Sequence, residues 1–225
     1  MTERTVLVTG AGGGLGGAVV AAFRSAGWRI VAPVRGPRLP DDDVVSVPGV
    51  DLTDEAAVAA AVDIADDPAA PLRAVVNLAG GYAGGTRVDE LALADFEGQF
   101  TRNVRPTFLV TRAALPRLVA GGGAIVCVAS RAAVTPFAGA SAYAASKAAV
   151  VAFAQAVAVE HRDTGVRCNV VLPSVIDTPA NRAAQPDADH RRWVPPAQIA
   201  GVIRFLADEE SAPTSGAAIP VYGRA

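Results

Sequence analysis

Short apolar runs alternate with longer segments of mixed or Ala-rich composition along the chain. Each run has four to six residues bounded by Gly, Pro or polar positions, which is typical of a buried strand. The predicted strands are Thr5–Val8, Arg29–Val34, Val44–Val47, Ala74–Asn77, Ala124–Val128, Arg167–Leu172 and Ala217–Tyr222. The predicted helices are Leu15–Ala26, Thr53–Ile64 with Thr53 as N-cap, Ala94–Leu118 with a bend near Pro106, Ser141–His161 and Ala197–Ala207. This alternation predicts an α/β fold, a single-domain Rossmann-type doubly wound parallel sheet of about seven strands over residues 1–225.

Two stretches interrupt the alternation. The segment Gly36–Asp43 is too short and too rich in Pro for a crossover helix. The segment Pro173–Pro196 has no clear period and is long for a simple connector. We expect residues 174–196 to form a lid over a substrate.

Charge and cysteine content exclude several classes of protein. Twenty basic residues against 22 acidic ones argue against a nucleic-acid binder driven by bulk charge. Cys127 and Cys168 are too few for a disulfide framework or a zinc site, which predicts a reduced, cytoplasmic setting and no metal. Glycines interrupt the uncharged N-terminal segment, so it is not a signal peptide. We also expect no segment with the roughly 18 apolar residues of a membrane span.

A glycine-rich loop follows the first predicted strand and precedes the first predicted helix. This context is typical of dinucleotide binding, because glycines let the backbone approach the pyrophosphate and the helix N-terminus attracts it. Three spacings fit the loop. They are Gly12, Gly14 and Gly17 in G-x-G-x-x-G, Gly10, Gly13 and Gly16 in G-x-x-G-x-x-G, and Gly10, Gly14 and Gly16 after Thr9 in T-G-x-x-x-G-x-G.

Tyr143 and Lys147 lie four residues apart near the start of a predicted helix, so they share one face. A cation beside a phenol favours the phenolate, which predicts a lowered pKa for Tyr143 and a role as general acid or base. Lys147 is the only lysine among 20 basic residues, which favours a need for an ammonium here. Ser130 follows a predicted strand, at the sheet edge where ligands bind. A surface Tyr–Lys pair without function is the alternative.

These motifs, taken in order over nearly the whole chain, resemble the short-chain dehydrogenase/reductase family. The matching positions are Thr9–Gly16, Asp51–Thr53, Asn77–Gly80, Asn103, Ser130, Tyr143 with Lys147, and Pro173–Thr178. The resemblance implies hydride transfer with NAD(H) or NADP(H). It also implies that Tyr143 donates the proton in reduction, Ser130 binds the carbonyl oxygen, and Lys147 lowers the tyrosine pKa and holds the nicotinamide ribose. Asn103 would keep a proton-relay water chain in place.

The same resemblance implies a set of cofactor contacts. Asp51 and Leu52 would contact the adenine, Asn77 to Gly80 the adenosine ribose side, and Thr178 the carboxamide. The full implied set is Gly10, Gly14, Leu15, Gly16, Arg35, Asp51, Leu52, Asn77, Ala79, Gly80, Tyr143, Lys147, Pro173, Val175 and Thr178. Leu78 and Ser174 depart from the common pattern, where many members have Asn and Gly, but neither takes part in the acid–base chemistry.

Locally the chain also resembles quinonoid dihydropteridine reductases. The similar stretches are Ala79–Gly85, Leu172–Arg182, Pro186–Asp189 and Trp193. Those enzymes lack the catalytic Ser and Asn, whereas this chain has Ser130 and Asn103. A carbonyl or secondary alcohol is therefore favoured over a pterin as substrate. A redox sensor that binds a dinucleotide without chemistry is a third, more remote alternative.

Cofactor choice and assembly complete the expectations. The acidic residue that would select NAD is replaced by Val34, and Arg35 follows, which favours NADP(H). The alternative is that Asp41 to Asp43 fold back to the ribose and select NAD. The helix after Tyr143 is apolar nearly all round, which predicts burial on two sides and a homodimer or homotetramer.

Overall fold

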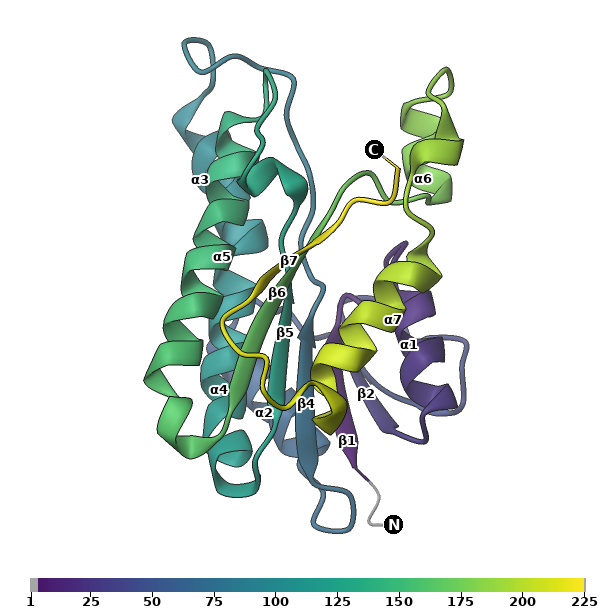
Figure 1. Cartoon of the computed structure of the whole chain (residues 1–225), viewed down its shortest axis with the longest axis vertical. Coiled ribbons are helices and arrows are strands. Elements are labelled where there is room, and N and C mark those ends of the chain that lie inside the picture. Colours follow the sequence, from purple (N-terminus) through teal and green to yellow (C-terminus); the bar gives the residue numbers. More distant parts are fainter. Residues whose placement is uncertain (1–3, 225) are drawn as a thin grey trace.

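Seven parallel strands form the centre of the computed structural model, which describes residues 4–224 (Figure 1). The strands are β1 (Thr5–Thr9), β2 (Arg29–Val34), β3 (Val44–Pro48), β4 (Leu72–Asn77), β5 (Ala124–Val128), β6 (Arg167–Pro173) and β7 (Ala218–Val221). Their order in the sheet is β3-β2-β1-β4-β5-β6-β7. All seven strands run in the same direction, so their carboxyl ends meet at one edge of the sheet. The predicted doubly wound sheet of seven strands is confirmed.

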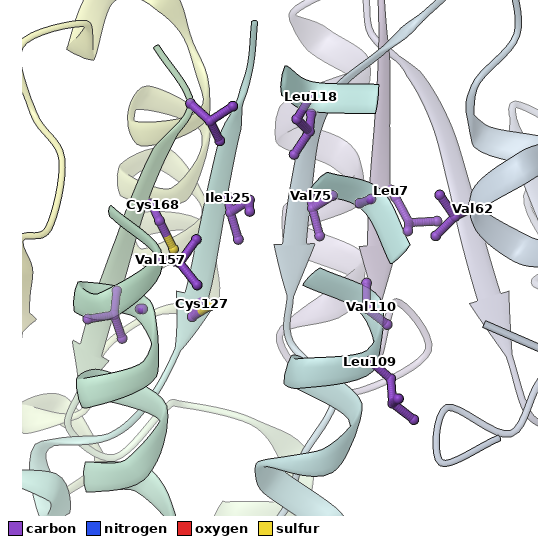
Figure 2. Packing of buried hydrophobic residues seen from close by; sticks show 14 of the residues in the cluster. Leu7, Val62, Val75, Leu109, Val110, Leu118, Ile125, Cys127, Val157 and Cys168 are labelled. Atoms are coloured by element: carbon purple, nitrogen blue, oxygen red, sulfur yellow. The ribbon is translucent and has the colours of Figure 1, made fainter. Parts of the chain in front are cut away.

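Helices cover both faces of this sheet. Helices α1 (Gly16–Ser25) and α7 (Pro196–Ala207) pack on each other over one face, and α2 (Glu55–Ala65), α4 (Arg105–Gly121) and α5 (Ser141–Glu160) cover the other (Figure 1). Because side chains alternate along a strand, Leu7 enters the core under α2, α4 and α5, whereas Val6 and Val8 enter the core under α1 and α7. Figure 2 shows the first of these cores, with Leu7, Val75 and Ile125 facing helix residues such as Val110 and Val157.

Three local details differ from the sequence-based expectations. Thr53 is not the N-cap of α2, because its backbone N–H and hydroxyl both donate to Asp51; Asp54 caps the helix instead, accepting from Ala57 N at 2.9 Å. The predicted helix 94–118 is two helices, α3 (Leu93–Asn103) and α4, separated at Val104. A short helix, α6 (Pro179–Ala184), lies in the stretch that showed no periodicity.

One described helix is long and apolar enough to cross a membrane by length and composition alone. This helix is α5, with 20 residues. In this fold α5 instead packs against α3, β5 and β6, and it buries Lys147 and Ser146. It is a core helix of the domain.

Candidate active site

The loop between β1 and α1 distinguishes the three glycine patterns. A Cβ added to Gly10 would lie 3.0 Å from Ala79 N, and Gly10 has a φ of +68°. A Cβ on Gly14 would lie 2.7 Å from Thr178 Cγ2, and one on Gly16 would lie 2.1 Å from the Ala11 carbonyl oxygen. Gly17, by contrast, faces open space. The geometry therefore supports the T-G-x-x-x-G-x-G spacing of Gly10, Gly14 and Gly16.

A cleft of about 850 Å³ runs along the carboxyl ends of the strands, from the glycine loop to α5. Eleven of the predicted cofactor-binding residues line it: Gly10, Gly14, Leu15, Gly16, Arg35, Leu52, Ala79, Gly80, Tyr143, Lys147 and Thr178. Within residues 4–224, no Asp or Glu lines this cleft. The glycine cradle that side chains would fill, and the cationic lining, fit a dinucleotide with its phosphates.

A larger hollow of about 1310 Å³ lies at the opposite, amino-terminal edge of the sheet. It contains none of the predicted site residues. Arg167, one of its lining residues, donates to the carbonyls of Leu206 and Asp208 at the end of α7. This is the usual place for a cation at a helix C-terminus. The cleft at the carboxyl edge, which holds the predicted site residues, is therefore the candidate active site.

Four predicted cofactor contacts do not line the cleft. The Asn77 side chain points into the interior and donates to Thr111 Oγ1 at 3.1 Å, which ties β4 to α4. Asp51 accepts from both donors of Thr53 and lies 3.8 Å from Arg35. Pro173 is buried at the end of β6, and Val175 is half-buried just after it. The Asn77 side chain therefore links β4 to α4.

Asn103 ends α3 and is fully buried. Its Oδ1 accepts from Gly81 N at 2.9 Å, and its Nδ2 donates to the Gly81 carbonyl at 3.1 Å and to Ser146 Oγ at 3.0 Å. The Ser146 hydroxyl donates to the Tyr143 carbonyl at 2.8 Å. This network joins the loop after β4 to the helix turn that carries Tyr143. Ser146 was not predicted as a site residue, although it lies within the Tyr143–Lys147 motif.

Lys147 lies directly behind the loop after β4. Its side chain is buried, and its Nζ donates to the Val128 carbonyl at 3.0 Å. A Cβ added to Gly80 would lie 2.6 Å from Asn103 Oδ1 and 3.2 Å from Lys147 Nζ. Burial lowers the pKa of Lys147 to about 8, partly offset by the nearby Cys127 thiol. The ammonium therefore has a defined position with little free space around it.

The Tyr143 phenol does not have the lowered pKa that the sequence predicted. Burial raises its pKa above the usual value of 10, and the neighbouring Tyr82 adds to this, while a hydrogen bond with the Ser130 hydroxyl partly opposes it. Ser130 itself follows β5 and caps a short turn, with its Oγ accepting from Ala132 N at 3.1 Å.

These features define a doubly wound α/β fold with a glycine cradle, and with a cleft lined by Tyr143 and Lys147 at the carboxyl edge of its sheet. A family model described as short chain dehydrogenase matches residues 4–189. The chain belongs to the short-chain dehydrogenase/reductase family and is an NAD(P)-dependent oxidoreductase.

Relatives and solved structures agree with this membership. The chain is 32% identical to 2-(R)-hydroxypropyl-CoM dehydrogenase of Xanthobacter autotrophicus, covering 98% of both chains. It is 35% identical to 2,3-dihydro-2,3-dihydroxybenzoate dehydrogenase of Escherichia coli, covering 92% of this chain and 90% of that one. A short-chain type dehydrogenase/reductase from Mycobacterium ulcerans superposes with a TM-score of 0.90 at 27% identity, covering 100% of this chain and 90% of that chain.

Proposed function

We propose that this protein transfers a hydride between NADP(H) and a ketone, aldehyde or secondary alcohol, with Tyr143, Lys147, Ser130 and Asn103 as its catalytic set. The observation that carries the proposal is that Tyr143 and the buried Lys147 line the same cleft, with the Ser130 hydroxyl close enough to Tyr143 to oppose the rise in its pKa. The two relatives named above act, by their names, as dehydrogenases of hydroxyl-bearing compounds.

The nicotinamide of the bound cofactor supplies or accepts the hydride. In the direction of reduction, the Tyr143 hydroxyl gives its proton to the carbonyl oxygen, and the Ser130 hydroxyl donates a hydrogen bond to the same oxygen. The Lys147 ammonium stabilises the phenolate that remains. Asn103 holds the loop after β4 against α5 through Gly81 and Ser146, and so keeps these groups in register.

Replacing Ser130 by Ala tests the substrate class. On a ketone, kcat/KM should fall by about 30- to 1,000-fold, equivalent to about 2–4 kcal/mol, because the developing oxyanion loses a donor. Steady-state kinetics of both proteins measure this, with the exposed Ser141→Ala as control. Reduction of a quinonoid dihydropterin forms no alkoxide and should not depend on Ser130. An unchanged rate on the best substrate would favour a pterin reductase, and no turnover of any compound would favour a sensor.

The preference for NADP(H) is proposed from Arg35. This side chain lines the cleft and is 82% exposed, and its ion pair with Asp51 is long, at 3.8 Å. Asp41 and Asp43 do not turn toward the cleft but pair with Arg24 of α1, at 2.6 and 3.6 Å. A 2′-phosphate would therefore find an exposed guanidinium, whereas a bare ribose would find no carboxylate among the described lining residues.

Arg35→Ala should lower kcat/KM for NADPH by roughly 10- to 100-fold, the size of a charge-assisted hydrogen bond. The value for NADH should change less than about threefold. Arg38→Ala is the matched control, since Arg38 lies on the same loop but does not line the cleft. A wild-type preference for NADH, or an Arg35→Ala protein that keeps its NADPH preference, would contradict the assignment.

A reduced, cytoplasmic setting is proposed from the two buried cysteines, which form no disulfide.

We also propose a homodimer or homotetramer built on the outer face of α4 and α5. Phe108 and Phe153 contact each other there with ring centroids 6.0 Å apart, beside a groove that Leu115 and Val119 also line. Phe108 is 43% exposed. Light scattering at micromolar concentration should give at least twice the chain mass of 22.8 kDa. Ala152→Glu, on the exposed face of α5, should give monomers. A wild-type monomer would contradict this assembly.

The lid is proposed for residues 174–196. Ile176, near its start, forms a parallel β-bridge with Val194, near its end. Thr178 lies against Gly14 of the glycine loop. Figure 1 shows α6 standing beyond the carboxyl edge of the sheet, across from α3 and the start of α5. A bound cofactor and substrate would thus lie between α6 and Tyr143.

A further inference from the structure

Two aromatic side chains stand beside Tyr143 and are not part of the acid–base set. The Tyr82 ring meets the Tyr143 ring edge to face, with centroids 5.0 Å apart and an angle of 87°. The Phe137 ring also packs against Tyr82, with centroids 6.1 Å apart. Tyr82 and Phe137 are 53% and 55% exposed, and Tyr82 lines the cleft. Large apolar faces are therefore open to solvent next to the phenol that transfers the proton.

The two loops that carry these rings are joined to each other. Gly85 N donates to the Gly139 carbonyl at 2.8 Å. A Cβ added to Gly84 would lie 2.5 Å from Tyr82 Oη, and one on Gly139 would lie 3.0 Å from the Gly85 backbone. The end of the Tyr82 side chain thus lies close against Gly84, and its ring packs on those of Tyr143 and Phe137. A surface held in this way binds a ligand with little further loss of conformational freedom.

We propose that Tyr82 and Phe137 form an aromatic wall that selects substrates with a flat, apolar ring attached to the reacting carbon, such as aryl ketones and the corresponding secondary alcohols. This inference rests on the proposed function, because it places the ring next to the oxygen that Tyr143 and Ser130 bind. Aromatic side chains contact flat rings favourably by stacking and edge-to-face packing, beyond the area they bury. A cationic substituent is disfavoured, because the charged side chains that line the described part of the cleft are Arg35, Arg102 and Lys147.

The test compares two ketones of similar size, flat acetophenone and puckered cyclohexyl methyl ketone. Wild-type kcat/KM should favour acetophenone by about tenfold, the size of one to two aromatic contacts. In Tyr82→Ala this ratio should fall close to one, mainly through a higher KM for acetophenone. Tyr82→Phe should keep the ratio, since it retains the ring. Val88→Ala is the control. Val88 lies in the same loop between β4 and α3 and is 72% exposed, but it does not line the cleft.

The result separates the wall from the proposed function. A wild-type ratio near one, or a ratio that Tyr82→Ala leaves unchanged, would overturn the wall while the reductase activity stands. If neither ketone is reduced with either cofactor, the proposed function fails. Calorimetric titration of the NADPH-loaded protein with 1-phenylethanol and 1-cyclohexylethanol then decides the wall by itself. A tenfold tighter Kd for the aryl alcohol, lost in Tyr82→Ala, supports it, and equal affinities overturn it.

Discussion

Replacing Tyr143 by Phe is expected to lower kcat by about 10³-fold, because a positioned general acid contributes about 10²–10⁴-fold. The aromatic ring stays, and so does its edge-to-face contact with Tyr82. The free energy of unfolding and the affinity for the reduced cofactor should therefore change little. Single-turnover kinetics measure the loss, and cofactor titration measures the affinity.

Tyr222→Phe is the matched control for this experiment. It removes a phenol whose ring lies under Arg131, at 5.2 Å, and which does not line the cleft. This variant should keep wild-type kcat. If Tyr143→Phe retained more than a tenth of the wild-type kcat, Tyr143 would not be the proton donor.

Lys147→Met is expected to abolish turnover and at the same time to stabilise the fold at pH 7. Burial lowers the pKa of this ammonium from 10.5 to about 8, which corresponds to a destabilisation of about 3 kcal/mol in the charged form. Loss of the hydrogen bond to the Val128 carbonyl offsets about 1 kcal/mol of that gain. Urea denaturation at pH 7 should show a net increase of about 2 kcal/mol in the free energy of unfolding.

The pH dependence of this gain has a definite sign. Below about pH 8 the lysine is charged in both folded and unfolded chains, so the cost of burying it is constant. Between about pH 8 and 10.5 the unfolded chain binds the proton more tightly than the folded one, so wild-type stability rises with pH relative to Lys147→Met. The advantage of Met should shrink over this window. A constant difference from pH 7 to pH 10 would contradict a buried, charged Lys147.

Lys147→Arg tests whether a positive charge at this position is sufficient for turnover. The Nζ lies between the Val128 carbonyl and Gly80, where an added Cβ would already approach it to 3.2 Å. A planar guanidinium is larger than an ammonium and needs a different arrangement of acceptors. This variant should keep a positive charge in the chain and still lose activity. Activity near the wild-type level would show that any cation serves at this position.

The fold was largely predictable from local patterns. Strands buried on both faces read as continuous apolar runs, so all seven strands were found and β2 and β5 have their predicted bounds. Where prediction failed, a hydrogen bond that the hydrophobic pattern does not show was present. The helix is interrupted at Val104, next to Asn103, whose side-chain amide is hydrogen-bonded to Gly81 in the loop after β4. The helical pattern of the sequence gives no sign of that contact. Asp54 replaces Thr53 as N-cap because Asp51 already engages Thr53.

The chemistry divides in the same way. The sequence by itself determined which residue types are available: one lysine, a tyrosine four residues before it, a serine after a strand and a glycine loop before a helix. Their places follow from local spacing, because the repeat of a helix puts residues four apart on one face and a strand end fixes where the next residue lies. Only the tertiary structure decided which glycines have no room for a side chain, that Asn77 faces the interior, and that Asp41 pairs with Arg24 rather than facing the cleft. It also decided that the pKa of Tyr143 is raised rather than lowered. Burial and hydrogen-bond partners set these properties, and both come from segments that are distant in sequence and meet only where the parallel strands end.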